Sequence, residues 1–254
     1  MVRSLAPHLP GRTIVAAEFG SKFVTPGNRA ALARKLSNRV IQSVRRHGKF
    51  IVIELDRGVL VVHLGMTGKL LLDAEPTQHA YGIFHLDHGT LLYDDPRQFG
   101  RIEFSETLPS RVAGLGPDAL GLPLGDFMAL LRRRNARIKP LLLNQRFIRG
   151  LGNIYADEAL FRARIHPRAQ SARISTSRAA ALHQSIVEIL ELAIQLRGSS
   201  ISDYVDASGE RGSFQTLHQV YGREGQPCPV CGTAIRRILV AQRGTHYCPR
   251  CQRA

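Results

Sequence analysis

Four cysteines in the last 27 residues constrain the fold of this chain more than any other feature of its sequence. They form two Cys-x-x-Cys pairs, Cys228 with Cys231 and Cys248 with Cys251, and sixteen residues separate the pairs. Each pair can turn tightly enough for both thiolates to reach one ion, so the spacing predicts a zinc ribbon with four sulfur ligands. Four thiolates leave no open coordination position, which makes the expected zinc structural and not catalytic. Two disulfides are the alternative, and the lack of an apolar signal core at the N-terminus argues against them.

The segment that carries these cysteines is also basic. Arg236, Arg237, Arg243 and His246 lie between the two pairs, and Arg250 lies inside the second. A ribbon hairpin with that rim is interpreted as a contact to the DNA backbone or minor groove. Because four thiols already complete a zinc site, the histidine is not expected to be a ligand.

The charge of the whole chain points to a polyanion. It has 35 basic and 20 acidic residues, a net charge of +15 and a pI near 10.6. Residues 1–127 carry 15 basic and 12 acidic groups, and residues 128–254 carry 20 and 8. Thirty of the basic residues are arginine, whose planar fork suits phosphate. Nucleic acid is therefore the first candidate partner, and a solvated basic face in an arginine-rich proteome is the alternative.

The first hundred residues read as strands. Short runs rich in Val, Ile, Leu and Phe alternate with turn residues, and Asp56-Arg57-Gly58 and Asp87-His88-Gly89 predict hairpin turns. Asn28 is expected to cap a helix that ends at Leu36. So many short strands predict a sandwich or barrel. The expected strands are Arg12–Val24, Arg39–Arg46, Phe50–Asp56, Val59–Leu64, Lys69–Asp73, Tyr81–Asp87, Thr90–Tyr93 and Arg101–Phe104.

Helical periodicity replaces this pattern after Pro109. We expect an α+β protein with a β domain at 1–108, a helical domain at 118–222 and a zinc finger at 223–254. A long loop region at 197–226 spans the boundary between the last two. No stretch reaches the roughly 18 apolar residues of a membrane span, so no membrane partner is expected. The expected helices are Asp126–Arg134, Ile138–Gln145, Asn153–Ala163 and Thr176–Leu196.

Two short loops present bulky side chains between turn residues. The segment 63–68 contains Met66, and the segment 95–100 contains Arg97 and Phe99. Proteins that take a base out of the stack insert such side chains to fill the hole, and an arginine can also bond the unpaired base opposite. Packing of Met66 and Phe99 in the protein core is the alternative.

Two further segments are candidates for phosphate contact. Residues 150–158 place glycines at the start of a helix, where backbone N–H groups favour an anion and Asn153 can add a side-chain donor. An ordinary glycine-rich helix start is the alternative. Lys49, a rare lysine among many arginines, is a candidate phosphate-positioning or titratable amine, and a surface lysine is the alternative.

Taken together, these segments resemble the formamidopyrimidine-DNA glycosylase family of bacterial base-excision repair enzymes. The resemblance runs essentially from end to end, and the tail is more similar to this branch than to the related endonuclease VIII branch. It implies an N-terminal β-sandwich and a helix–two-turn–helix domain with a zinc finger, with double-stranded DNA between them. The segments that carry it are residues 6–14, the Lys49 strand, 63–68, 95–100, 138–140, 150–158, 220–223 and 241–248.

The resemblance also implies an activity and roles for individual residues. Family members excise 8-oxoguanine and ring-opened purines and then cut the abasic strand by β,δ-elimination. Lys49 matches a lysine assigned to phosphate contact and elimination, and Arg243 matches an arginine assigned to phosphate contact and δ-elimination. Residues 202–212 resemble a mobile loop over the extruded base. Met66, Arg97 and Phe99 match residues that fill the gap left by the flipped nucleotide. The other positions that match DNA contacts are His79, Asn135, Asn153 and Arg243.

The sequence departs from the family pattern at three places. The family begins, after its Met, with a Pro whose amine attacks the sugar and a Glu that acts as acid and base, and neither is present here. Asn135 and Gln98 stand where basic residues are common, which should weaken phosphate binding. We expect a misassigned start codon, so that the true product carries the Pro and Glu. The alternatives are a damaged-DNA-binding module without catalysis, and a weak lyase in which buried Lys49 is the amine.

The same resemblance sets expectations for partners and location. It implies one structural zinc ion as the only cofactor, and DNA with oxidised bases or abasic sites as the partner. We expect a monomer in the bacterial cytoplasm, associated with the nucleoid. The genomic sequence upstream of Met1 distinguishes the start-codon hypothesis from the other two, because an in-frame Met-Pro-Glu supports it and a nearby stop codon excludes it.

Overall fold

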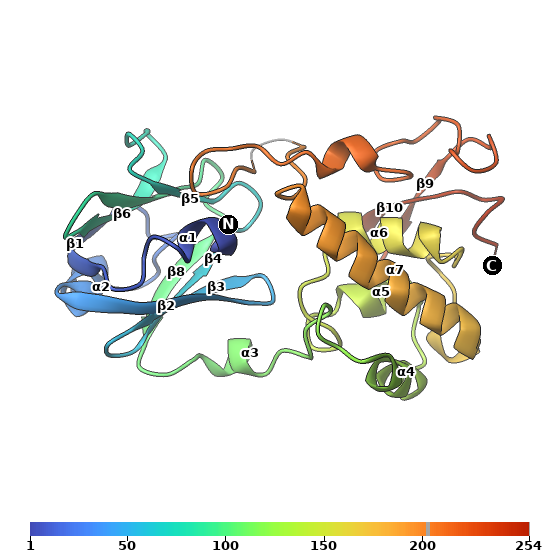
Figure 1. The fold of residues 1–254 in the computed structure, drawn as a ribbon, viewed down its shortest axis with the longest axis horizontal. Helices are drawn as coiled ribbons and strands as arrows, with labels where there is room; N and C mark the ends of the chain where they lie inside the picture. The colour runs from blue at the N-terminus through green and yellow to red at the C-terminus, as the bar shows by residue number, and fades with distance from the viewer. Residues whose placement is uncertain (202–203, 254) are drawn as a thin grey trace. The chain divides into compact units, whose positions relative to one another are not determined.

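The computed structural model describes residues 1–201 and 204–253, and it divides into two compact units (Figure 1). The first unit contains Met1–Gly114 together with Arg197–Ser213. The second contains Leu115–Leu196 and the chain from Phe214 onward. Mixed α and β elements confirm the predicted α+β class. The expected domain boundaries stay predictions, and Ser202 and Asp203 of the expected mobile loop lie outside the described residues.

The described part of the first unit holds an eight-stranded antiparallel sheet in the order β5-β7-β6-β1-β2-β3-β4-β8. Only two residue pairs join β1 to β2, so the sheet folds there into two four-stranded layers (Figure 1). The layers touch across the core, since a Cβ built on Gly82 of β6 would lie 3.0 Å from Ile102 Cδ1 of β8. The strands are β1 Thr13–Phe19, β2 Arg39–His47, β3 Phe50–Leu55, β4 Val59–His63, β5 Lys69–Leu72, β6 Ala80–Leu86, β7 Thr90–Asp94 and β8 Arg101–Ser105.

Local sequence explains where these elements begin and end. Asn28 caps α2, Arg29–Leu36, and accepts a hydrogen bond from Ala31 N at 2.9 Å, as predicted. The expected strand Arg12–Val24 is too long, because the Ser21 hydroxyl accepts hydrogen bonds from two following backbone N–H groups and turns the chain after β1. One short helix, α3 Ser110–Ala113, was not predicted. Residues Val2–Leu5 form a second short helix, α1.

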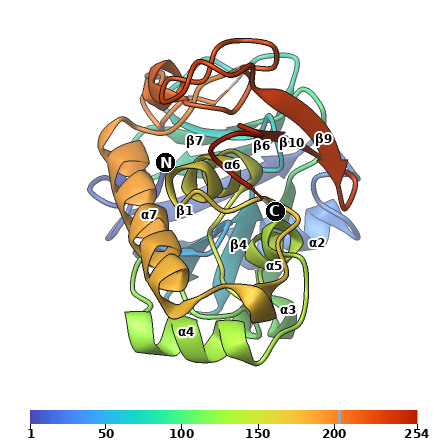
Figure 2. The ribbon, with the colours of Figure 1, turned by 90° about the vertical axis from the view of Figure 1, so that its right-hand side faces the viewer.

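The second unit is a helical bundle that carries the cysteine ribbon. Helix α7 packs on α6 and α4 (Figure 2). Its apolar residues Leu182, Ile186, Ile189, Leu190 and Ala193 are buried. Helices α5 and α6, with the turns at 144–152 between them, form the helix–two-turn–helix. The elements are α4 Leu124–Arg132, α5 Ile138–Leu143, α6 Asn153–Arg162, η1 Ser171–Arg173, α7 Thr176–Gln195, η2 Phe214–Leu217, β9 Arg236–Val240 and β10 Arg243–Tyr247.

None of the described helices combines the length and the apolar character that a membrane span requires.

Candidate functional site

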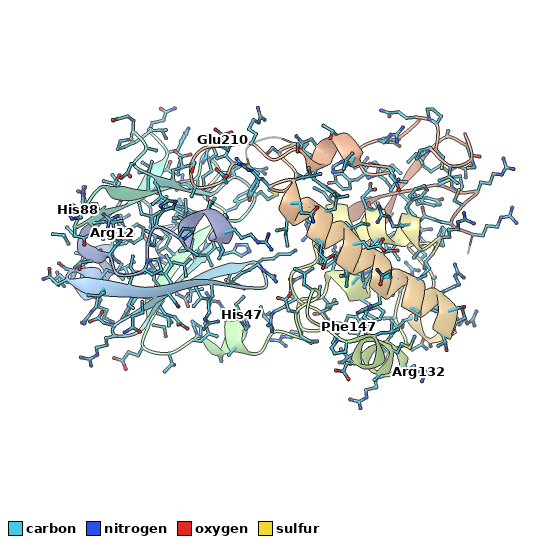
Figure 3. All side chains as sticks on the ribbon, in the orientation of Figure 1. Arg12, His47, His88, Arg132, Phe147 and Glu210 are labelled. Atoms are coloured by element: carbon cyan, nitrogen blue, oxygen red, sulfur yellow. The ribbon has the colours of Figure 1, made fainter. Side chains whose placement is uncertain are left out.

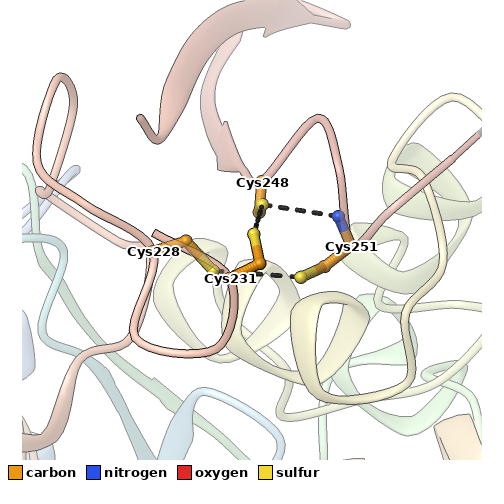
Figure 4. Close-up of side chains that lie close together, drawn as sticks. All are labelled: Cys228, Cys231, Cys248 and Cys251. Carbon is orange, nitrogen blue, oxygen red and sulfur yellow. Dashed lines mark hydrogen bonds between the residues drawn. The ribbon is translucent and has the colours of Figure 1, made fainter. Parts of the chain in front are cut away.

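The four cysteines converge as the sequence predicts. Their sulfur atoms all lie within 4.8 Å of one another (Figure 4). The Cys231–Cys248 and Cys228–Cys251 sulfur pairs are 3.4 Å and 3.9 Å apart, too far for disulfide bonds. Four sulfurs at about 2.3 Å from one tetrahedral ion would be about 3.8 Å apart, which these distances bracket. The cysteines therefore form a structural zinc site, and the disulfide alternative is wrong.

Hairpin β9–β10 presents Arg243 at its tip. The turn residues Ala241 and Gln242 have φ of 48° and 61°, so both are left-handed, as in the tight turns that join antiparallel strands. Arg243 follows the turn and is exposed. His246 was predicted on the exposed rim of the ribbon, and this prediction is wrong. The residue is buried, and its backbone N–H donates to Asp157 Oδ2 at 2.9 Å.

A buried ion pair anchors this hairpin to the helices. Lys139 of α5 and Asp157 of α6 have fully buried side chains, and Lys139 Nζ lies 2.6 Å from Asp157 Oδ1. The same amine donates to Gly244 O at 3.0 Å and to Thr245 Oγ1 at 2.8 Å. Burial lowers the pKa of Lys139, and the aspartate opposes that shift. The backbone next to Arg243 is thus fixed from inside the protein.

Sequence reasoning missed this pair as a functional element. A lysine inside the apolar run 138–143 is the signal that could have found it, since a charge there needs a buried partner. Asn153 belongs to the same assembly, because its Nδ2 donates to Gly244 O at 3.1 Å, which engages one of its two amide hydrogens. The side-chain oxygen of Asn153 is buried without a hydrogen-bond partner among the described residues. Helix α6 begins at Asn153, as predicted.

Asn135 lies in an exposed, basic stretch that follows α4. Arg132 stands at the end of this helix (Figure 3). Arg133, Arg134 and Arg137 are exposed as well, and no acidic residue lies between them in the sequence. The stretch retains positive charge although Asn135 itself is neutral.

In the first unit, the loops at 63–68 and 95–100 expose the three predicted gap-filling side chains. Met66 is 58% exposed and Phe99 is 53% exposed, so neither packs in the core and that alternative is wrong. The Arg97 guanidinium lies over the Phe99 ring, 4.6 Å from its centre. His79, half-buried, belongs to the chain before β6, and its carbonyl accepts from Asp95 N at 3.0 Å.

Lys49 lies in the tight turn between β2 and β3 and is exposed. A Schiff-base role that depends on its burial beside Arg45 and Arg46 therefore has no structural basis, and Arg45 pairs instead with Glu54 at 2.7 Å. This corrects the weak-lyase hypothesis.

A cationic cluster that the sequence did not reveal surrounds His63. Burial lowers the pKa of its imidazole, and three neighbouring cations lower it further: Lys49, Arg111 and Arg101. Arg111 is partly neutralised by Glu103, with which it forms a bidentate pair at 2.7 and 2.8 Å. The cluster makes this part of the first unit attractive to anions.

Comparison with known proteins covers the whole chain. Three family models match the chain. The formamidopyrimidine-DNA glycosylase N-terminal domain matches residues 1–102, and the formamidopyrimidine-DNA glycosylase H2TH domain matches residues 115–205. A zinc finger found in FPG and IleRS matches residues 225–254. A formamidopyrimidine-DNA glycosylase of Solibacter usitatus is 54% identical over 100% of this chain and 96% of its own length. A formamidopyrimidine-DNA glycosylase of Variovorax paradoxus is 42% identical over 99% of this chain and 96% of its own length.

Solved structures agree with the sequence relatives. MutM (FPG) of Thermus thermophilus has a TM-score of 0.89 and 39% identity, and the match covers 99% of this chain and 95% of that one. The Lactococcus lactis Fpg bound to DNA that contains an abasic site has a TM-score of 0.89 and 36% identity, with coverage of 100% and 97%. A mutant of the Lactococcus protein bound to Fapy-dG containing DNA has a TM-score of 0.89 and 35% identity, with coverage of 100% of this chain and 97% of that one.

Proposed function

Because this chain belongs to the formamidopyrimidine-DNA glycosylase family, we propose that, provided the family's N-terminal Pro and Glu are present, it excises oxidised purines, 8-oxoguanine and formamidopyrimidines, and then cleaves the abasic strand by β,δ-elimination. The family consists of DNA glycosylases that are also abasic-site lyases. A binding module without catalysis is not favoured, because relatives matched over the full chain are glycosylases. The observation that carries the proposal is the exposure of Met66, Arg97 and Phe99 on two adjoining loops.

These three side chains fit the space that an extruded nucleotide leaves. An enzyme that acts on a base inside a duplex must turn the nucleotide out of the stack, and unstacking costs free energy. Met66 and Phe99 supply apolar surface for the vacated position. Arg97 is already stacked on the Phe99 ring, which leaves its fork free to bond the unpaired base opposite.

The cationic groups are proposed to hold the strand. Lys49 and the His63 cluster would contact phosphates from the first unit, and Arg243 and Asn135 from the second. His79 and Asn153 are proposed DNA contacts too, Asn153 through its second amide hydrogen or the backbone N–H at its helix start, since one amide hydrogen is engaged. For elimination, Lys49 and Arg243 are proposed proton donors beside the leaving phosphates.

The proposal has a direct binding test. A duplex with one tetrahydrofuran residue, a stable abasic analogue, should bind more tightly than the intact duplex of the same sequence. Catalysis is tested with an 8-oxoguanine duplex and borohydride on protein that carries the family's N-terminal Pro and Glu, because borohydride traps the Schiff base between the proline amine and the sugar. Equal affinity for the two duplexes, or a trapped yield at the level of a protein-free control, would contradict the proposal.

Arg97→Ala is expected to lower the preference for the tetrahydrofuran duplex by about fivefold to a hundredfold, the range of one good contact to a base. The measurement is the ratio of Kd values for intact and tetrahydrofuran duplexes. Arg57→Ala removes the same charge from the exposed β3–β4 turn and serves as the control, with an unchanged ratio. An equal loss of affinity for both duplexes in Arg97→Ala would refute the gap-filling role.

Affinity for DNA is expected to rise as the pH falls from 7.5 to 6. The lowered pKa of His63 keeps its imidazole neutral in the free protein at pH 7, whereas a bound phosphate favours the protonated form. Binding therefore takes up a proton, and linkage limits the gain to about tenfold per pH unit for one group. The readout is the increase in DNA affinity between pH 7.5 and 6, which wild type should show and His63→Gln should lack. Identical pH profiles for the two proteins would show that His63 does not face phosphate.

We also propose a monomer that works on the bacterial chromosome in the cytoplasm. The relatives named above come from bacteria. Each of the proposed roles is filled by one copy of the chain, so sedimentation should give the monomer mass near 28.1 kDa.

A further inference from the structure

The loops at 63–68 and 95–100 meet at one buried carboxylate. Asp95 is 0% exposed and accepts three hydrogen bonds: from Thr67 Oγ1 at 2.5 Å, from Gly100 N at 2.8 Å and from the Tyr93 hydroxyl at 3.1 Å. Thr67 is also buried and directly follows Met66 in the sequence. One carboxylate therefore ties the Thr67 side chain of the first loop to the backbone of the second.

The two loops are also in direct contact. A Cβ built on Gly65 would lie 2.7 Å from the carbonyl carbon of Phe99 and 2.8 Å from Gly100 N, closer than real side chains approach. Gly65 has a φ of +65°, in the left-handed region that favours glycine. A Cβ on Gly100 would overlap the Tyr93 hydroxyl. Neither loop can shift alone without disturbing the other.

The middle of the second loop is held from the opposite side. Gln98 has a φ of +54°, and its backbone N–H donates to Asp95 O at 3.0 Å. Its side-chain oxygen accepts from the buried Ser21 hydroxyl at 2.5 Å, and its amide donates to the Tyr81 hydroxyl at 3.3 Å. The residue between Arg97 and Phe99 thus faces its own protein, and its two neighbours point to solvent.

We propose that Asp95 and Thr67 are positioning residues that join Met66, Arg97 and Phe99 into one preformed wedge, with Gln98 as a second anchor. The inference rests on the proposed function, since it assigns the device that aims the gap-filling side chains. Loops that were flexible before binding would lose conformational freedom when their side chains entered the base stack of the duplex. That loss would weaken binding to the tetrahydrofuran duplex specifically. A tied wedge avoids the loss.

Thr67→Val tests the inference, because valine keeps the shape of threonine and removes only the hydroxyl. The ratio of Kd values for intact and tetrahydrofuran duplexes should fall about fivefold to tenfold, the effect of one lost hydrogen bond that leaves a buried acceptor less satisfied. Thr67→Ser keeps the hydroxyl and should restore the ratio. The salt dependence of binding should stay unchanged, because no phosphate contact is lost.

The matched control removes the same kind of hydrogen bond elsewhere in the first unit. Ser43→Ala deletes a hydroxyl that donates to Glu54 Oε2 at 2.7 Å on strands β2 and β3. Its Kd ratio should equal that of wild type. Thermal unfolding of all variants shows whether each protein is folded under the binding conditions.

A double-mutant cycle separates aiming from general stability. If Thr67 acts by placing Met66, Thr67→Val should have clearly less effect on the Kd ratio in a Met66→Ala background than in wild type. Full additivity, or an unchanged ratio in Thr67→Val while wild type prefers tetrahydrofuran, would overturn the inference. A wild type without that preference would instead overturn the proposed function, so the two failures are distinguishable.

Discussion

Chelation of the zinc is expected to unfold the ribbon and to weaken binding to every duplex, while the sandwich stays folded. The apolar cluster of the ribbon is small: Cys228, Ile235 and Cys248 pack with Phe161 and Val220. Structural zinc sites supply roughly 10–16 kcal/mol of apparent binding free energy that is also folding free energy. With the hairpin unfolded, Arg243 loses its fixed place.

Hydrogen exchange measured by mass spectrometry checks this prediction. Amides of β9 and β10 should lose protection in excess chelator, whereas amides of β3 and β4 should keep theirs, and added zinc should restore both protection and DNA affinity. Persistent protection of β9 and β10 in zinc-free protein would show that the helices alone hold the ribbon.

Lys139→Met is expected to destabilise the second unit by about 3–5 kcal/mol, the usual cost of leaving one partner of a buried ion pair alone. The Asp157 carboxylate would remain fully buried without its cation, and Gly244 and Thr245 would lose a shared donor. Denaturant unfolding followed by far-UV circular dichroism measures the change. DNA affinity should fall as well, because the backbone beside Arg243 loses its anchor.

An exposed ion pair of the same unit provides the control. Arg162 and Glu188 lie 2.9 Å apart with side chains 37% and 45% exposed, so Arg162→Met should cost less than about 1 kcal/mol. In Lys139→Met with Asp157→Leu, no unpaired charge is left and much of the stability should return. If Lys139→Met lowers the free energy of unfolding no more than Arg162→Met does, the anchoring role is refuted.

Much of the fold could be predicted from the sequence because it depends on local signals. The cysteine spacing alone indicated the ribbon, and periodicity placed α6 and α7 within a residue or two of their observed ends. Turn residues at Gly58 and Gly89, both with positive φ, marked the hairpins that join β3 to β4 and β6 to β7. These features depend on neighbours in sequence, which a single chain reveals.

Long-range pairings were less accessible. The Lys139–Asp157 pair and the contacts of Asp95 with Thr67 join residues that lie 18 and 28 positions apart, and no local pattern specifies them. Exposure of Met66 and Phe99 was likewise undecided, because an apolar side chain between turn residues suits a core and a wedge equally. The cations around His63 come from separate segments, so their convergence required the folded sheet.

A crystal structure of this protein on a duplex with one tetrahydrofuran residue would show whether the exposed side chains of the two loops fill the vacated position. Met66, Arg97 and Phe99 should lie within the base stack at the modified position, with the hydrogen bond from Thr67 to Asp95 intact. A complex in which these side chains contact only solvent or their own protein, beside an unbroken base stack, would contradict the gap-filling role.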